Sequence, residues 1–496
     1  MTSGYVAPRY GNWRRPSTSG LGKLNFITAM LMFVGLAVTV LLMMVATFGV
    51  AVGTAAVFAA AIGSTLFKDS HGRSIGERVV TRAGWWRTRK AGAHLYRSGP
   101  LGRTDFGRFR APGVLAQSRL LEGRDAFGEP FALLAVPATG HYTLVFACDP
   151  PDTNAIDDPV VDQWVANYGG WLARVAEVHD VRAASATVET CPSTGTEFRA
   201  SLDKRRAPGS PEHTRRVVDE LRESGSGGSV IHGWATITFT AQGSGGSRRS
   251  DAQMLREIAV QVPGMAADLA ATGAGSVNAA TAYDLCEMVR TSYDPAVGPL
   301  FEQARAAGER VDISWDEVGP SATQATWDSY RHDSGLSVTW AMSGAPRGHV
   351  LSGVLRRLLE PTAGIERKRV TLLYQPLAPQ EAVAAVESDE RNANNRASGR
   401  SSQRAKQEAA AAMRSAIEEA QGAGVTDFGM LVTATIRPDQ NLAWARTAIH
   451  NAAGACRTRL RVVHGSQDSA FAASLPLGLV LPEHVTTPRL VREAVR

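Results

Sequence analysis

The chain has 496 residues, enough for two to four domains at roughly 100–200 residues each. Hydrophobic residues make up 44% and charged residues 20%, which excludes a largely disordered or collagen-like protein. The mean hydropathy of −0.12 excludes a transporter that is buried in a membrane along its whole length. Lysine and arginine total 53 against 47 acidic residues, so the net charge of +6 is small and its location matters more than its size.

The cysteines are far apart in the sequence and form neither a CxxC motif nor a cluster with histidine. This spacing argues against a disulfide-rich secreted scaffold and against a zinc ribbon, and it favours a reducing compartment that faces the cytosol. The four cysteines are Cys148, Cys191, Cys286 and Cys456.

An uncharged segment lies near the N-terminus, where positions 24–67 between Lys23 and Lys68 carry no charged residue. One helix of that length would rise roughly 65 Å, whereas the hydrocarbon core of a bilayer is about 30 Å thick and takes about 20 residues per span. The length therefore predicts a transmembrane helical hairpin with spans at 26–46 and 50–67.

Both flanks of this segment are basic. Residues 1–25 carry four cations and no acid, and residues 68–110 carry eleven Lys/Arg against three acids. Lys/Arg are enriched in cytoplasmic loops next to membrane spans. The flanks therefore predict a two-pass protein of the cytoplasmic (inner) membrane with both termini in the cytoplasm.

The second predicted span is built from small residues at helical spacing, namely Gly49, Gly53, Ala56, Ala60 and Gly63. Small residues let two helices approach closely in lipid. We expect them either to pack the hairpin on itself or to dock against another membrane subunit.

The basic residues on both flanks predict contact with anionic lipid, since Lys/Arg beside a span are attracted to a negative leaflet. The Trp85-Trp86 pair suits the membrane interface. A nucleic-acid patch is the competing interpretation for this run, which also contains Arg82. The predicted lipid-contact residues are Arg14, Arg15, Lys23, Lys68, Arg73, Arg78, Trp85, Trp86, Arg87, Arg89 and Lys90.

From about Arg110 onward the pattern becomes that of a soluble, mixed α/β protein. Alternating apolar residues predict strands, and a 3.6-residue apolar period predicts helices. In the first half the order strand, helix, strand, helix, strand is the ferredoxin-like order. The predicted segments are 131–137, 142–148, 159–178, 181–190, 211–223 and 231–242, followed by a mainly helical region at 250–306.

A similar order recurs after the predicted strands 338–342 and 369–374. A long helical stretch at 379–421, interrupted by a polar loop at 392–403, precedes a strand, a helix and a strand at 428–436, 441–453 and 459–463. We therefore predict an α+β fold: the N-terminal transmembrane hairpin followed by a cytoplasmic part with two ferredoxin-like α/β modules. The predicted divisions are 1–25 (basic tail), 26–67 (hairpin), 68–114 (basic juxtamembrane segment), 115–360 and 361–496.

The sequence contains none of the common catalytic motifs. No GxxxxGK[ST] occurs, and Gly22-Lys23 is followed by Leu24 at the membrane border, so the phosphate cradle of an ATPase is missing. HExxH, a GxSxG elbow and a GxGxxG after a strand are also absent. We expect no enzyme activity, no cofactor and no metal.

The best remaining polar cluster runs from Asp312 to Asp333 and contains Asp316 and His332. Carboxylates beside a histidine could form an acid/base pair or a metal site. The tryptophans and the tyrosine between them favour a structural or contact role instead. A membrane-tethered enzyme that uses this cluster is one alternative function.

Three stretches carry a resemblance to a known family: RYGNWRRP at 9–16, RKRVTLLYQP at 367–376 and HGSQDSAFAASLPLG at 464–478. Together they resemble an actinobacterial family of membrane proteins from integrative and conjugative elements. The layout is similar to the two-span inner-membrane subunit of type IV secretion fused to the N-terminal, non-ATPase domain of the conjugation ATPase.

This resemblance implies a membrane-anchored scaffold that recruits a separate conjugation-type ATPase and other secretion-channel subunits within an oligomeric assembly. A core component of a type VII secretion-like system is a second alternative, and direct nucleic-acid binding is a weaker one. Helix 405–421 and the stretch 470–480 are candidate contact surfaces, with internal packing as the other interpretation. The residues proposed for partner contact are Arg367, Arg369, Phe471, Leu475 and Pro476.

Overall fold

The computed structural model describes residues 7–11, 13, 26–45, 47–67, 69–99, 102, 109–151, 156–178, 180–207, 209–224, 228–243, 246–346, 348–398, 403–420 and 424–484. Its helices are α1 (Phe26–Val45), α2 (Phe48–Leu66), α3 (Ile75–Lys90), α4 (Asp158–Glu177), α5 (Thr196–Arg205), α6 (Glu212–Ser224), α7 (Asp251–Leu269), α8 (Ala282–Tyr293), α9 (Gly298–Ala307), α10 (Arg356–Leu359), α11 (Pro379–Ser398), α12 (Gln403–Ala420), α13 (Leu442–Ala455) and α14 (Gln467–Ser474).

The strands are β1 (Leu95–Arg97), β2 (Arg119–Arg124), β3 (Pro130–Val136), β4 (His141–Asp149), β5 (Val181–Ser193), β6 (Gly228–Thr240), β7 (Ser276–Ala279), β8 (Ala322–Ala325), β9 (Tyr330–His332), β10 (Gly335–Gly344), β11 (Arg367–Pro376), β12 (Thr426–Ile436) and β13 (Arg459–Val462).

Within the described residues these thirteen strands form one antiparallel sheet. Its order is β1-β8-β9-β10-β12-β11-β5-β6-β4-β3-β2, with β13 beside β10 and β7 beside β4. The prediction of two ferredoxin-like modules is therefore wrong, because β11 pairs with β5 from Lys368–Thr190 to Tyr374–Ala184 and makes one sheet of both halves. Pairing these two long strands also removes two sheet edges that would otherwise expose unpaired backbone groups.

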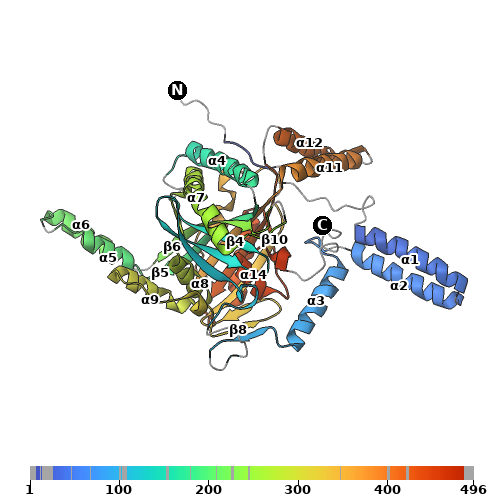
Figure 1. The fold of residues 1–496 in the computed structure, drawn as a ribbon, viewed down its shortest axis with the longest axis horizontal. Coiled ribbons are helices and arrows are strands. Elements are labelled where there is room, and N and C mark those ends of the chain that lie inside the picture. Colours follow the sequence, from blue (N-terminus) through green and yellow to red (C-terminus); the bar gives the residue numbers. More distant parts are fainter. Residues whose placement is uncertain are drawn as a thin grey trace.

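The two halves of the sheet repeat one strand order. The first runs β7-β4-β6-β5 and the second β13-β10-β12-β11, so each half places its fourth, first, third and second strands side by side. A pair of helices is inserted between the second and third strand of each half, α5–α6 in the first and α11–α12 in the second. These two arms project from opposite sides of the body (Figure 1).

The helices α4, α7, α10 and α13 pack on one face of the sheet. In the first half Trp171 and Val175 of α4 lie in a core with strand residues such as Phe146 and Ile237. In the second half an equivalent cluster joins α13 and α10 to β10, β11 and β12. α4 begins with Asp157 at its N-cap position and Pro159 in its first turn, an arrangement that favours helix initiation.

The opposite face carries a band of buried hydroxyl side chains, covered by α8, α14 and the chain after α14. Neighbouring strands are linked by pairs of these hydroxyls, such as Ser185 to Thr236 at 2.7 Å and Thr339 to Thr433 at 2.9 Å. The Ser474 hydroxyl at the end of α14 accepts a hydrogen bond from Thr433 at 2.8 Å. Each buried hydroxyl is thereby satisfied, which a polar group in a core requires.

A buried ion cluster joins the two halves where β5 meets β11. The carboxylate of Glu189 on β5 pairs with Arg367 at 3.2 Å and with Arg369 at 2.7 Å, both on β11. Arg369 also donates to the Ser292 hydroxyl on α8 at 2.6 Å. Burial by itself would raise the pKa of Glu189, but attraction to the two guanidinium groups outweighs burial and holds the pKa at about 2.

The helices α1 and α2 lie side by side and project from the body (blue in Figure 1). Only α2, among the described residues, is long and apolar enough to cross a membrane. Within α1 the apolar stretch found among the described residues is Met32–Val45, which is shorter than the roughly 20 residues that a span takes. The predicted two-pass topology and transmembrane hairpin are therefore wrong, because a lack of charge does not by itself supply two spans.

Candidate functional site: a basic and aromatic groove on α3

A short corner centred on Asp69 connects α2 to α3. One carboxylate oxygen of Asp69 accepts the backbone N–H groups of His71 and Arg73 at 2.8 and 2.9 Å, and the other pairs with Arg78 at 2.5 Å. These bonds, of which the Arg73 N–H is the strongest influence, lower the pKa of Asp69 to about 2. Gly72 sits at φ +81°, a backbone conformation that favours glycine. The corner therefore fixes the direction in which α3 leaves α2.

α3 is capped at both ends by residues that suit its dipole. The Ser74 hydroxyl accepts the Glu77 N–H at 3.2 Å, and Arg87, Arg89 and Lys90 occupy the last turn. No residue of α3 is buried, although Trp85 packs against the body. A stripe at helical spacing combines apolar and cationic side chains, namely Ile75, Val79, Arg82, Trp86 and Arg89.

A groove of about 720 Å³ runs along this side of α3. Its far wall is Trp327, which belongs to the turn between β8 and β9 and lies far from α3 in the sequence. The Arg82 guanidinium lies 5.2 Å from the centre of the Trp327 ring, and Trp327 stacks on His464 at 5.2 Å. The groove is lined by Arg78, Val79, Arg82, Ala83, Trp85, Trp86, Arg89 and Trp327.

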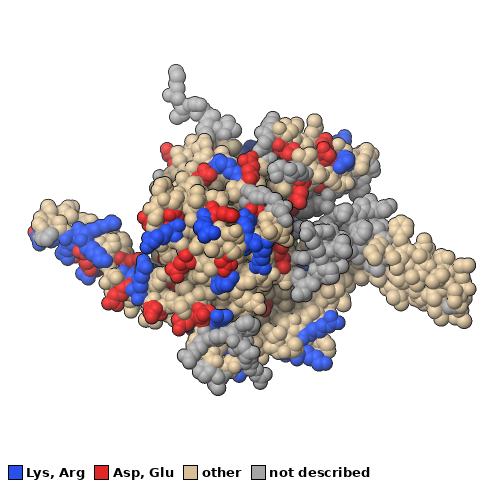
Figure 2. Space-filling model, in the orientation of Figure 1, with Lys and Arg blue, Asp and Glu red and all other residues tan. Residues whose placement is uncertain are grey.

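The cationic side chains in and beside the groove differ in whether they pair with a carboxylate. Arg73 and Arg78 pair with Glu77 and Asp69 and hold the corner. Within the described part of the chain, by contrast, Arg82, Arg87, Arg89 and Lys90 form no ion pair with a carboxylate, and Lys90 lies over the Trp86 ring at 5.3 Å. On the face shown in Figure 2, the rod of α1 and α2 is tan, whereas α3 beside it carries blue side chains. The groove can therefore bind an anion that also has an apolar part.

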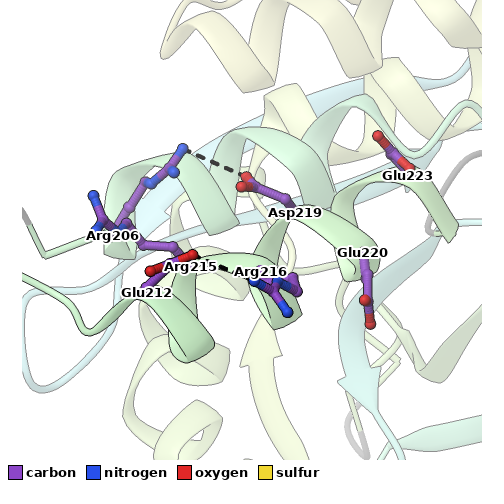
Figure 3. A pocket seen from close by; sticks show the side chains of 7 residues that line it. All are labelled: Arg206, Glu212, Arg215, Arg216, Asp219, Glu220 and Glu223. Carbon is purple, nitrogen blue, oxygen red and sulfur yellow. Dashed lines mark hydrogen bonds and ion pairs between the residues drawn. The ribbon is translucent and has the colours of Figure 1, made fainter.

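A second hollow lies on the arm α5–α6 (Figure 3), and two of its arginines pair with acidic side chains of the same lining. Arg206 points toward Asp219 at 3.6 Å, and Arg216 pairs with Glu212 at 3.3 Å. Three arginines and four acidic side chains line this hollow, so it offers an anion no excess of positive charge.

All of the predicted lipid-contact residues that the structure describes lie on α3 or on the corner before it. Arg14, Arg15, Lys23 and Lys68 lie outside the described residues. The prediction overlooked the contribution of Trp327 and His464, because nothing in the local sequence links them to residue 82.

The small residues of α2 face away from α1. A Cβ atom added at Gly49, Gly53 or Gly63 would meet nothing within 4 Å, and Ala56 and Ala60 are exposed. The close approach is made instead by Gly35 of α1, where an added Cβ would lie 2.7 Å from the Phe58 ring. Packing of the two helices on each other therefore does not use the predicted stripe, and docking to another subunit remains a prediction.

The residues proposed for partner contact all lie inside the protein. Arg367 and Arg369 belong to the buried cluster around Glu189. Phe471 and Leu475 are 0% and 1% exposed, and Pro476 is also buried, so these side chains serve internal packing.

The cluster from Asp312 to Asp333 does not converge on one point. His332 is fully buried and its ring bonds to the Tyr293 carbonyl and the Ser337 hydroxyl. Asp316 pairs with Arg110 at 2.7 Å on the surface. A third member of the cluster, Asp333, pairs with Arg290 at 3.1 Å, and Asp328 pairs with Arg446 at 2.8 Å. No group of three His, Cys, Asp or Glu in the described ranges is placed to hold a metal ion.

Comparison with known proteins identifies a family for the N-terminal part of the chain but does not assign an activity. No curated protein matches this chain. Residues 17–77 match a family model described as "Domain of unknown function (DUF8461)". This stretch contains α1, α2 and the Asp69 corner, and it ends in the first turn of α3, directly before the groove.

Proposed function

We propose that this protein is a membrane-anchored scaffold subunit of a type IV secretion-like conjugative DNA-transfer machine, and that it recruits a separate ATPase. The observation that carries the anchor is the exposed apolar rod of α1 and α2. Met44, Phe48 and Val57 are 81%, 73% and 69% exposed, and the rod has no charged residue. A continuous apolar surface of this size needs an apolar environment or a partner, and α2 is the helix that meets the length of a span.

The link to conjugation rests on the resemblance of three sequence stretches, and these stretches contact the same half of the sheet. The 367–376 stretch is β11, and the 464–478 stretch contains α14, which lies across β11. The Thr371 hydroxyl donates to the Ser474 carbonyl at 2.7 Å. In the first stretch, the backbone of Tyr10 pairs with Val350 just before α10, and the Trp13 ring lies 5.3 Å from that of Phe428 on β12. The second and third stretches thus pack on each other, and the first contacts β12 beside β11, which supports a shared architectural unit.

A scaffold needs outward surfaces for its partners, and the two arms supply them. The α5–α6 arm exposes Phe198, Val217 and Leu221 at 46%, 41% and 45%. On the α11–α12 arm, Met413 and Ile417 are 57% and 47% exposed. Exposed apolar side chains on a projecting helix pair are a common form of protein contact surface.

The test is affinity capture of the tagged full-length protein from native membranes in mild detergent, followed by mass spectrometry. We expect a Walker-motif ATPase in stoichiometric amount. A variant with Val217→Ser and Leu221→Ser on the α5–α6 arm should retain less of it. Val160→Ser on α4, where the wild-type side chain is 43% exposed, is the matched control on the body.

Other outcomes would contradict the proposal. Recovery of type VII secretion subunits would instead assign the protein to a type VII secretion-like system. Recovery of the protein alone would remove the main support for a scaffold role. The alternative of a membrane-tethered enzyme predicts that Asp316→Ala abolishes DNA transfer between cells. The scaffold proposal predicts that transfer continues, because Asp316 makes only a surface ion pair.

A further inference from the structure

We propose that the groove on α3 is a binding site for the phosphate headgroup of anionic membrane lipids, formed by Arg82 and Arg89 against Trp86 and Trp327. This inference deepens the proposed function and rests on its membrane anchor. It divides the basic run after α2 into two groups, one that holds the corner and one that binds lipid.

The first step is to identify which cations on and before α3 pair with a carboxylate. Arg73 and Arg78 are held by Glu77 and Asp69, so their charges are largely neutralised. Arg82 and Arg89 have no carboxylate partner among the described residues and line the same groove about two helical turns apart. Two guanidinium groups on one helix face match the oxygen atoms of a phosphate group, to which each can donate two hydrogen bonds.

The second step is the apolar part of the groove. Val79 and Trp86 alternate with the two arginines on the stripe and are 62% and 63% exposed. Val80 next to them is 72% exposed. A helix with cationic and apolar side chains of this kind lies in the plane of a membrane interface, with its aromatic ring at headgroup level.

The third step is the position of α3. It starts at Ile75, shortly after α2 ends at Leu66, and the Asp69 corner fixes the angle between them. A groove at the end of a span lies at the depth of the lipid headgroups. A nucleic acid would also meet the cations, but it would leave Val79 and Val80 in water. The lipid therefore fits the whole surface better.

The experiment uses the full-length protein in mild detergent, titrated with dihexanoyl phosphatidylglycerol or dihexanoyl phosphatidylcholine and followed by calorimetry. We expect phosphatidylglycerol to bind more tightly, with an affinity that falls as salt rises. The double substitution Arg82→Gln with Arg89→Gln should weaken this binding by roughly thirtyfold, since two cations near a membrane surface are removed. Binding of phosphatidylcholine should change little.

The matched control is Arg215→Gln with Arg216→Gln on α6, which removes the same charge from another exposed helix and should leave the preference unchanged. Equal binding of the two lipids, or a preference that survives in the α3 variant, would overturn the inference. So would displacement of the lipid by equimolar inorganic phosphate or by a short DNA duplex.

A separate readout distinguishes this site from the anchor. Alkaline carbonate extraction of native membranes reports whether the wild-type chain is embedded. If it stays in the membrane but binds both lipids equally, the headgroup site is wrong and the anchor stands. If it is extracted, the anchor itself is wrong.

Discussion

Replacing Glu189 by glutamine should strongly destabilise the sheet at the line where its halves meet. The carboxylate is 1% exposed and is shared by Arg367 and Arg369, so its loss leaves two guanidinium groups buried without a counter-charge. Removing one partner from a buried ion cluster costs about 3–5 kcal/mol. At roughly 2.1 cal/mol/K per residue, a body of roughly 400 residues would lose about 4–6 °C in its unfolding midpoint.

The assay is thermal unfolding of the purified full-length protein in detergent, followed by circular dichroism. The control is Glu212→Gln on α6, which breaks an exposed ion pair with Arg216 and should shift the midpoint by less than about 1 °C. A Glu189→Gln midpoint within 1 °C of that control would refute the reasoning. The triple substitution Glu189→Leu, Arg367→Leu, Arg369→Met should recover most of the loss, because no charge remains buried.

The buried cluster around Glu189 also determines how the stability difference between the wild type and Glu189→Gln depends on pH. The folded-state pKa of Glu189 is about 2, below its ordinary value near 4.5. The carboxylate therefore contributes stability that is complete above about pH 4.5 and is lost as the pH falls toward 2. We expect the gap between the wild type and Glu189→Gln to narrow across that window.

Three further predictions concern single positions. Gly35→Leu should separate α1 from α2 and lower the midpoint, since even a Cβ there would lie 2.7 Å from Phe58, whereas Gly53→Leu meets open space and should be neutral by the same assay. Burial lowers the pKa of His332 to about 4, so the folded protein should lose stability as the pH falls from about 6.5 to 4. In denaturant titrations at several pH values, His332→Asn should lose this pH dependence. An unchanged slope of unfolding free energy against pH in the variant would contradict the prediction. Burial likewise lowers the pKa of Lys368 to about 8, so stability should rise between pH 8 and 10.5, and Lys368→Met should flatten this rise.

Local sequence pattern predicted many elements within a few residues. The helix expected at 159–178 is α4, Asp158–Glu177, and the strand expected at 181–190 is the first part of β5. These succeed because apolar periodicity and capping residues act over neighbouring positions. The pattern cannot say which strand edges meet, since the pairing of β5 with β11 joins residues about 180 positions apart.

The same limit explains the outcomes at the candidate site. An apolar motif such as that around Phe471 has the same sequence pattern whether it lies in a core or at an interface. Its packing against the sheet shows that it is internal. The groove needs Trp327 and His464, which reach α3 through the turn after β8 and the chain after β13. The stripe of small residues on α2 had the right spacing for close packing, but spacing does not tell which side the neighbour occupies.

The arms α5–α6 and α11–α12 are inserted at the same connection of each repeat. The strand pairing of the sheet therefore does not depend on the sequence or length of either arm. Each arm interrupts the link between two strands that already pair with each other along most of their length. Lengthening such a link costs little, because loop-closure entropy grows only slowly with the number of residues. An arm can thus be exchanged for another helix pair, or retuned for a new partner, while the hydrogen bonds of the body stay in register.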